Sequence, residues 1–568
     1  MKKYGLLTII GVTLILALAY IFFTKPINEK TNLHAPLFDN LGAFHRQITT
    51  NVPLAQRYFD QGMVLAYGFE HGEAIRSFKE ATRLDPNCAM CYWGLALALG
   101  NKMNAPMNGH EYSDGKEAIQ KALLLMNNVT PAEQDYIKAL SLRYKHEPLK
   151  TNQASAPSCH KSNSSPDAAT KSERLAYVNA MKNIVEKYPH DNDAKALYGA
   201  ALFFSNTESD PSYDSETARL ATNVLKEAIA DDPNHVGANH YFIHVTEPYA
   251  HPEDALKSAK LFKTLVPGSE HLVHMQSHIF TRLGQYHEAA EANIQATKVY
   301  EQYIQDCHTQ GFEPEINYLY FHNYDFLRTA ASMEGNQELA LSAANKIVTS
   351  PFPEWLENDP SLQWFIPVPY FVQARFALWD EILKEPMPKT IYGYAQGMWH
   401  YARGMALANK GDLKAAMDEE SHLKQIIQQG KIDSNLGEDG YNLLTIANDM
   451  LLATLANITG DEKALFTYLN QVMEVQDKMR YREPSALYFT PKQALGDAYL
   501  KYGHFEQAKV MYEEDLHEYP KNGWTLYGLA ISLRALGDNI KADQVDNEFK
   551  QAWQYADVPT PILLFSKK

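Results

Sequence analysis

The sequence predicts an all-α protein in which helix–turn–helix hairpins repeat and stack into a superhelical solenoid. Equivalent residues recur at a 34-residue spacing: His274 follows His240, and His278 follows His244, by that interval. Small residues, turn glycines and large apolar residues recur at matching places in several units. Strand-like alternation of polar and apolar residues is sustained nowhere in the 568 residues, which removes the main competing fold class.

Composition bounds the possible functions. The formal net charge is −16 and the sequence has no basic block, which argues against nucleic acid as a partner because phosphates require clustered Lys and Arg. Charged residues make up 21% and aromatic residues 11% of the chain, which is a globular composition. Only four cysteines are present, so a scaffold built from disulfides is excluded at this length.

Residues 1–24 are expected to be a targeting segment. Lys2 and Lys3 precede an apolar run over residues 6–23, which at about 1.5 Å per residue is roughly 27 Å long and marginally spans a bilayer. The lysines should stay cytoplasmic, which places the bulk of the chain outside the cytoplasm. The favoured interpretation is an uncleaved single-pass anchor in a bacterial cytoplasmic membrane; the alternative is secretion after cleavage near Ala19. Residues 25–40 are expected to form a linker.

The first repeat segment is expected over residues 41–350. Its first unit, at 54–87, has Gly62 and Ala74 where two helices would approach closely, Leu65 and Phe78 where they would fill the space, and Pro86 where the second helix would stop. Later in this segment, Thr130 and Glu133 predict a capping box.

A polar insert over residues 148–172 interrupts the segment, and helices are expected again at 173–188 and 193–204. Beyond the insert, Gly284 and Gly335 are expected to be hairpin turns of the central repeats.

Residues 351–390 are rich in Pro and Trp, and no regular helix is expected over 351–369, so we interpret this stretch as a crossover between two solenoid segments. Repeats return over residues 391–556. Gly537 follows Gly503, and Ala542 follows Ala508, at the 34-residue spacing. Residues 557–568 are expected to be a tail.

The units at 54–87, 489–522 and 523–556 each resemble a tetratricopeptide repeat (TPR). Over residues 40–555 the chain resembles a family of exported bacterial TPR proteins. The motifs that carry this resemblance are YGFEHGEAIRSF, CAMCYWG, NHYFIH, HLVHMQSHIF, FHNYDFL and PKNGW. The resemblance implies the fold and a scaffold that binds proteins or peptides, and it adds little about chemistry.

Histidines gather in the central repeats. We number the places in each repeat so that the turn glycine is place fifteen. The histidines then fall at places two, five and nine, on the first helices of three successive repeats. Those places face the concave groove of such solenoids, and helices that pack side by side lie about 8–10 Å apart. The candidate metal ligands are His240, His244, His271, His274, His278 and His322, with the carboxylates Glu247 and Asp325.

Such a cluster suits a transition metal, because imidazole is a ligand for Zn, Cu and Fe and a carboxylate often completes the site. Two other interpretations remain open: a pH-sensitive peptide groove, and structural hydrogen bonding. An open coordination position would permit metal-dependent hydrolysis or oxidation, so a metalloenzyme is the alternative to a metal-binding scaffold.

The Cys88-x-x-Cys91 spacing fits a redox pair or disulfide, half of a metal site, or two core cysteines. The next residue is Tyr92, so covalent haem attachment is excluded. No phosphate-binding glycine loop is present, and we expect no nucleotide cofactor. In the C-terminal repeats, groove places carry an apolar and aromatic set suited to a peptide, with inter-repeat packing as the alternative: Met398, Tyr401, Met405, Trp524 and Tyr527.

Overall fold

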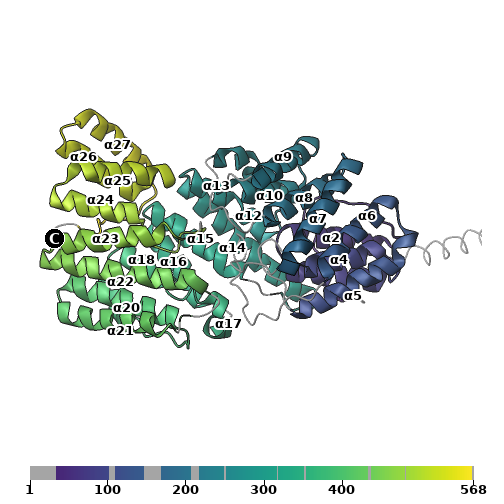
Figure 1. The fold of residues 1–568 in the computed structure, drawn as a ribbon, viewed down its shortest axis with the longest axis horizontal. Helices are drawn as coiled ribbons and strands as arrows, with labels where there is room; N and C mark the ends of the chain where they lie inside the picture. The colour runs from purple at the N-terminus through teal and green to yellow at the C-terminus, as the bar shows by residue number, and fades with distance from the viewer. Residues whose placement is uncertain are drawn as a thin grey trace, which may run out of the picture.

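The computed structural model is an elongated array of helices, with the N-terminal half at one end and the C-terminal half at the other (Figure 1). It describes residues 33–100, 109–145, 168–205, 216–248, 251–315, 318–350, 353–430, 432, 436–479 and 482–565. Within these ranges every regular element is a helix, as the sequence predicts. None of the described helices is both long and apolar enough to cross a bilayer. The expected anchor at residues 1–24 lies outside the described residues.

The first hairpin shows why the repeats stack. Helices α2 (Pro53–Tyr67) and α3 (His71–Leu84) pack together, and the Phe78 ring lies between Gly62 of α2 and Gly94 of α4. A Cβ atom at either glycine would meet this ring within 2.8 Å, which is closer than real contacts allow. The ring therefore holds three consecutive helices in contact, and the predicted role of Gly62 and Phe78 is confirmed.

Three further hairpin-forming stretches complete the N-terminal half, and the predicted capping box of Thr130 and Glu133 is present at the start of α6. The elements are α4 (Ala89–Leu99), α5 (Gly109–Leu125), η2 (Met126–Asn128), α6 (Pro131–Ser141), η3 (Leu142–Tyr144), α7 (Ala168–Lys187), α8 (Asn192–Ser205) and α9 (Glu216–Asp231). The last residues of the predicted insert at 148–172 belong to α7.

The central repeats follow, and their first helices carry the histidines. The elements are α10 (Val236–Thr246), η4 (Pro252–Ala255), α11 (Leu256–Leu265), α12 (Glu270–His274), α13 (Gln276–Arg282), α14 (Tyr286–Thr309), α15 (Leu319–Met333) and α16 (Gln337–Val348). Gly284 and Gly335 occupy their turns with φ values of +66° and +78°, where glycine avoids the penalty of a Cβ atom.

The crossover is more helical than predicted. It contains α17 (Pro353–Asn358), η5 (Pro360–Leu362), α18 (Val368–Arg375) and α19 (Trp379–Lys384), so the expectation of no regular helix over 351–369 is wrong. Proline stands in the first turn of α17 and of α18. A proline there costs nothing, because the first N–H groups of a helix have no partner within it. The prolines therefore start short helices here.

The C-terminal repeats are α20 (Gly393–Lys410), α21 (Leu413–Gln429), α22 (Gly437–Thr459), α23 (Glu462–Gln476), α24 (Pro491–Tyr502), α25 (Phe505–Glu518), α26 (Gly523–Ala535) and α27 (Asn539–Ala552). Their last hairpins dock on the central repeats. The Trp524 indole N–H donates to the Ser332 carbonyl at 2.9 Å, and the Arg375 guanidinium lies 3.8 Å above the Trp524 ring.

This packing removes most of the predicted peptide groove. Met398, Tyr401, Met405 and Trp524 are 1–3% exposed and belong to the hydrophobic cores, so a peptide could not reach them. Only Tyr527 is partly accessible, with its ring against Phe549. Packing between repeats is the role of the buried four.

The expected linker and tail are also packed where they are described. In the linker, the Ala35 carbonyl accepts from the Tyr58 hydroxyl at 2.7 Å. In the tail, Phe565 is 1% exposed and the Leu564 N–H donates to Asp497 at 2.8 Å. Neither segment has apolar residues at a helical spacing, so nothing in the sequence indicated that they pack against the repeats.

Candidate metal centre

Four neighbouring helices bring six histidine side chains into one buried cluster. Helix α10 carries His240 and His244, α12 carries His271 and His274, α13 carries His278, and α15 carries His322. Residues four apart on a helix have adjacent side chains, and the stacked first helices of successive repeats place these pairs against one another. Six of the eight predicted ligands are therefore brought together.

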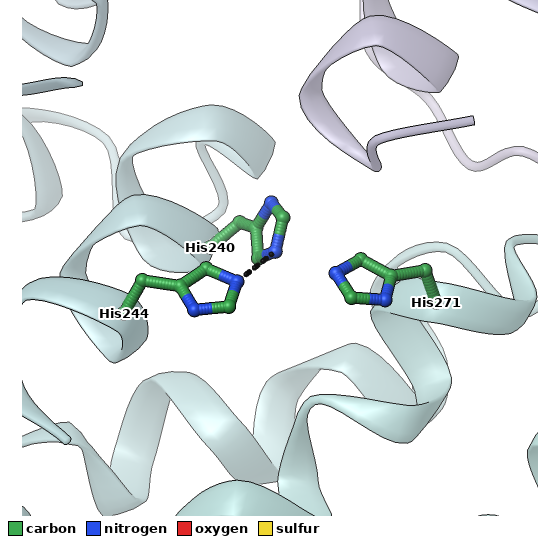
Figure 2. Close-up of side chains that lie close together, drawn as sticks. All are labelled: His240, His244 and His271. Carbon is green, nitrogen blue, oxygen red and sulfur yellow. Dashed lines mark hydrogen bonds between the residues drawn. The ribbon is translucent and has the colours of Figure 1, made fainter. Parts of the chain in front are cut away.

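His240, His244 and His271 form the first group, which we call triad A. The His240 and His244 Nε2 atoms are 3.0 Å apart. Figure 2 shows His271 facing this pair from the opposite helix, and its ring centroid is 5.1 Å from that of His240. One nitrogen from each of the three rings lies within 4.8 Å of the others, which is a spacing that one metal ion could span.

His274, His278 and His322 form the second group, triad B. The His274 Nε2 atom is 2.9 Å from His278 Nε2 and 3.0 Å from His322 Nε2. The two triads adjoin, since the His244 and His278 ring centroids are 5.6 Å apart and those of His271 and His274 are 5.7 Å apart. The six imidazoles thus make one continuous block.

The repeat relates the two triads. Each triad takes its first two histidines from places five and nine of one repeat and its third from place two of the next repeat. The step from His271 to His322 is longer than 34 residues because α14 extends over Tyr286–Thr309. The triads are therefore structurally equivalent sites generated by the stacking of hairpins.

Hydrogen bonds at the Nδ1 atoms fix which nitrogens face inward. His240 Nδ1 donates to the Tyr67 carbonyl, and His278 Nδ1 donates to Glu247 Oε1 at 2.7 Å. His274 Nδ1 lies 2.6 Å from Asn293 Oδ1, and this amide is oriented by its own N–H bond to the Ala289 carbonyl. In a neutral ring that donates from Nδ1, Nε2 carries no proton and has a lone pair. Each of these Nε2 atoms points into a triad.

His271 makes no such bond. Its side chain is 0% exposed, and neither ring nitrogen has a hydrogen-bond partner among the described residues. A buried polar atom without a partner costs about 1–3 kcal/mol. An ion in triad A would remove that cost.

Burial favours the neutral form of His240, His271 and His274. Five of the six histidines are 0% exposed and His322 is 5% exposed. Desolvation lowers the pKa of His240 to about 3, although the hydrogen bond that His240 donates to the Tyr67 carbonyl acts to raise this pKa. The pKa values of His271 and His274 also lie well below the usual range, mainly through burial and secondly through the neighbouring imidazoles. Neutral imidazole is the form that binds metal.

A phenylalanine covers each triad. The Phe326 ring centroid lies 4.5–4.8 Å from the rings of all three triad B histidines. Phe69 lies 4.5 Å from His240 and 5.3 Å from both His244 and His271. Phe69 occupies the place that Gly284 and Gly335 hold in later repeats, with a φ of +60°. A left-handed conformation costs a bulky residue about 1–3 kcal/mol, so strain is stored beside triad A.

The two predicted carboxylates have different positions. Glu247 is fully buried, and its Oε1 accepts from the outer nitrogen of His278, which is the position of a residue that orients a ligand. Asp325 is in neither triad, and its carboxylate binds the Arg328 guanidinium. Its role as a metal ligand stays a prediction.

Sequence reasoning missed the residues that support the cluster: Tyr67, Phe69, Asn293 and Phe326. Phe69 had a detectable signal, because a phenylalanine replaces the turn glycine five residues before the close-contact Ala74. The Tyr67 contribution is a backbone carbonyl, and the sequence does not reveal which carbonyls face a site.

No described cysteine belongs to either triad. Cys88 and Cys91 form a buried disulfide at the start of α4, which leaves no thiolate there for a metal. Cys307 is a buried free thiol, and Cys159 lies outside the described residues.

A third group with metal-ligand spacing is formed by His400, Glu419 and His422 in the C-terminal repeats. The Glu419 carboxylate also accepts from Arg403 at 3.0 Å, and a cation there would be repelled by the guanidinium. His422 is exposed. This group is therefore weaker than the buried triads.

A small pocket borders triad B. Of the six histidines, only His322 lines it, together with Asp325, Arg328, Trp364 and Arg482. The pocket lies between α15, the crossover, α20 and the segment before α24.

No protein-family model matches this sequence, and no curated protein matches it. Among solved structures, the chain is similar to a human IFIT1 dimer with m7Gppp-AAAA, at 10% identity over 89% of this chain and 91% of that chain, with a TM-score of 0.32. It is also similar to the TPR domain of P58(IPK), at 10% identity over 86% of this chain and 99% of that chain, with a TM-score of 0.21. At these scores the likenesses carry no conclusion about function.

Proposed function

We propose that this protein binds two transition-metal ions, one in each histidine triad, on a helical-repeat scaffold. The observation that carries the proposal is the facing pair of Nε2 atoms in each triad. In triad B, the hydrogen bonds of His274 to Asn293 and of His278 to Glu247 direct two lone pairs at one another across 2.9 Å. Lone pairs at that distance repel, and a cation between them removes the repulsion.

The distances between the Nε2 atoms are those expected for nitrogens that bind the same metal ion. Two nitrogens each about 2.0–2.1 Å from one ion are roughly 3–3.4 Å apart, close to the observed separations. Nitrogen ligands without thiolate favour Zn, Cu(II) or Fe over Cu(I), Mg or Ca. The Nδ1 hydrogen bonds would hold each ring in its binding orientation, as the outer partners of histidine ligands do in known metal sites.

The test is metal stoichiometry after loading the metal-free chain with Zn or Cu(II) and removing loosely bound ions. We expect two ions per chain. His244→Ala should remove one by breaking triad A, and His278→Ala should remove one by breaking triad B. X-ray absorption spectroscopy should show imidazole nitrogen ligands in each case.

His422→Ala is the matched control, because it removes a histidine from the third group and leaves both triads intact. It should keep two tightly bound ions. The proposal would be contradicted if the wild-type chain bound no ion. It would also be contradicted if His422→Ala were the only variant to lose an ion.

A metalloenzyme is the second candidate, and His322 favours it. Because this ligand lines a pocket, an ion in triad B would have an open side that a substrate could reach, as hydrolysis or oxidation requires. Cobalt-loaded protein should change its visible spectrum on addition of azide. That change should disappear in His278→Ala and persist in His244→Ala; a spectrum indifferent to azide would count against catalysis at triad B.

We propose that the chain is exported and held at the outer face of a bacterial cytoplasmic membrane by residues 6–23. The buried Cys88–Cys91 disulfide supports this location, because disulfides persist in oxidising compartments. Cell fractionation should find the intact chain in the membrane and accessible to protease from outside; a soluble chain shortened by cleavage near Ala19 would favour secretion.

We also propose that the stacked hairpins bind a protein partner. The architecture supports this role, and Tyr527 remains partly accessible. A photoreactive side chain at position 527 should capture a discrete partner in cells, whereas one at the exposed Arg219 should not. Equal capture at both positions would argue against a specific interaction there.

A further inference from the structure

The His271 ring has rings of both triads around it. Its centroid is 5.1 Å from that of His240 in triad A and 5.7 Å from that of His274 in triad B. The corresponding distances to His244 and His322 are 6.1 Å and 6.5 Å. His271 therefore lies at similar distances from the two triads, although the repeat pattern assigns it to triad A.

These separations are the ones that rings bound to a common ion have. With a metal–nitrogen bond of about 2.0–2.1 Å, the centroid of an imidazole lies roughly 3.2 Å from the ion. Two rings that share the ion then have centroids roughly 5–6.5 Å apart, depending on the bond angle at the metal. The position of His271 thus permits a bond to an ion in either triad.

Both nitrogens of His271 are available, unlike those of the rings beside it. Hydrogen bonds occupy the Nδ1 atoms of His240, His274 and His278, so each of those rings offers a metal one nitrogen. Both His271 nitrogens are buried and have no hydrogen-bond partner among the described residues. Figure 2 shows one of them facing His240 and His244 and the other facing away from that pair. An ion in triad A alone would leave the second nitrogen without a partner.

The electrostatic surroundings of His271 also come from both triads. Burial is the main cause that holds its pKa well below the usual range, followed by the imidazoles of His240 and then of His274. The ring is therefore neutral, with one lone pair and one N–H. An ion at the lone pair leaves the N–H, which a second ion can replace because metal binding releases protons from its ligands.

We propose that His271 bridges the two ions, with one ring nitrogen bound to the ion of triad A and the other bound to the ion of triad B. The inference rests on the proposed metal function and goes beyond it, because the triads then form one dinuclear centre. The N–H proton passes to solvent as the second ion binds, so the bridge is an imidazolate. The two nitrogens of a ring are about 2.2 Å apart, which with bonds of about 2.0–2.1 Å on each side places the ions roughly 6 Å apart.

The experiment loads the full chain with Cu(II), removes loosely bound ions and measures electron paramagnetic resonance at liquid-helium temperature. Copper analysis of the same sample converts the signal to unpaired electrons per bound ion. An imidazolate bridge pairs the electrons of the two ions antiferromagnetically, whereas ions in separate sites each keep one unpaired electron. We expect the wild-type signal to lose at least half of the intensity of independent ions.

His271→Gly removes the bridge and should restore one unpaired electron per copper ion, whether one ion or two stay bound. Added imidazole can enter the space left by the side chain, and it should bring back the loss of signal. His422→Ala removes a histidine outside both triads and should leave the coupling as it is in the wild type.

The results separate the bridge from the metal function on which it rests. Two bound copper ions with one unpaired electron each in the wild-type chain would overturn the bridge and leave the metal function standing. Coupling that persists in His271→Gly without imidazole would do the same. A chain that binds no copper would overturn both. The wild-type measurement needs no variant, so it decides the matter even if circular dichroism shows that His271→Gly does not fold.

Discussion

At the scale of single residues, the centre depends on side chains that orient the ligands. Glu247 and Asn293 each accept from the outer nitrogen of a triad B histidine. They come from different elements, Glu247 from the end of α10 and Asn293 from α14. Neither touches the place where an ion would sit, so each acts through the ring it holds.

Glu247→Ala should weaken the affinity of triad B by about 10–100-fold, because loss of the outer partner frees the His278 ring and leaves its Nδ1–H unsatisfied. Glu247→Gln keeps an acceptor oxygen and removes the charge, so it should restore most of the affinity. Competition with a chromophoric chelator measures both. Equal loss in the two variants would show that the charge matters and the orientation does not.

Buried histidines also set the response to pH. Burial lowers the pKa of His240 to about 3 and those of His271 and His274 well below 6.5. A proton competes with a metal only below the pKa of its ligand in the folded chain. His240 and His271 in triad A and His274 in triad B should therefore keep their metal bonds as the pH falls from 7.5 to 5, whereas exposed imidazoles release theirs near pH 6.5.

Metal release into a chelator at each pH is the measurement, and a release midpoint near pH 6.5 would contradict this expectation. Thermal stability is a poorer readout. The lowered histidine pKa values remove stability as pH falls below 6.5, because the unfolded chain takes up the protons. The pKa values of Glu70 and Asp497, raised to about 8 and about 7 mainly by burial, act with the opposite sign.

At the scale of elements, one hairpin turn departs from the others. Later turns use Gly284, Gly335 and Gly503 at positive φ, while the α2–α3 turn uses Phe69 and inserts its ring against triad A. The strained backbone at Phe69 allows its ring to cover the triad A histidines.

Phe69→Gly should relieve the backbone strain and still lower the free energy of unfolding by about 2–4 kcal/mol, since loss of a buried phenyl ring costs more than the strain returns. Ions in triad A should then exchange faster with a chelator, while those in triad B keep their rate. Phe326→Ala is the matching control for triad B, and it should accelerate the exchange of ions from triad B alone. Faster exchange from both triads in either variant would show general loosening.

At the scale of the whole molecule, the C-terminal repeats close on the central ones through Trp524. Its ring is 1% exposed, contacts Arg375 and lies 5.3 Å from Trp553. The scaffold and the metal centre are therefore held by different contacts, and they should be separable.

Trp524→Ala should lower the free energy of unfolding by about 3–5 kcal/mol through the cavity it leaves, and it should expose the α26–α27 hairpin to limited proteolysis. Stoichiometric binding in triad A should persist, because His240, His244 and His271 lie on α10 and α12. Loss of metal from triad A in this variant would mean that the closure itself holds the centre together.

The sequence alone determined the helical repeats and the convergence of six histidines. Both follow from periodicity. The four-residue spacing places His240 beside His244 and His274 beside His278 on one helix face, and the 34-residue interval puts the two pairs at the same place in successive hairpins without knowledge of contacts. Helix signals such as Thr130 and Glu133 are local in the same sense.

The tertiary structure decided what periodicity does not encode. It buried Met398, Tyr401 and Trp524, which the repeat pattern placed in a groove, because the C-terminal hairpins pack on one another and back onto the central repeats. It paired Asp325 with Arg328, and it brought the Tyr67 carbonyl to His240 across 173 residues. These outcomes depend on which surfaces meet when the solenoid closes, and a contact between distant segments leaves no mark on the spacing of either one.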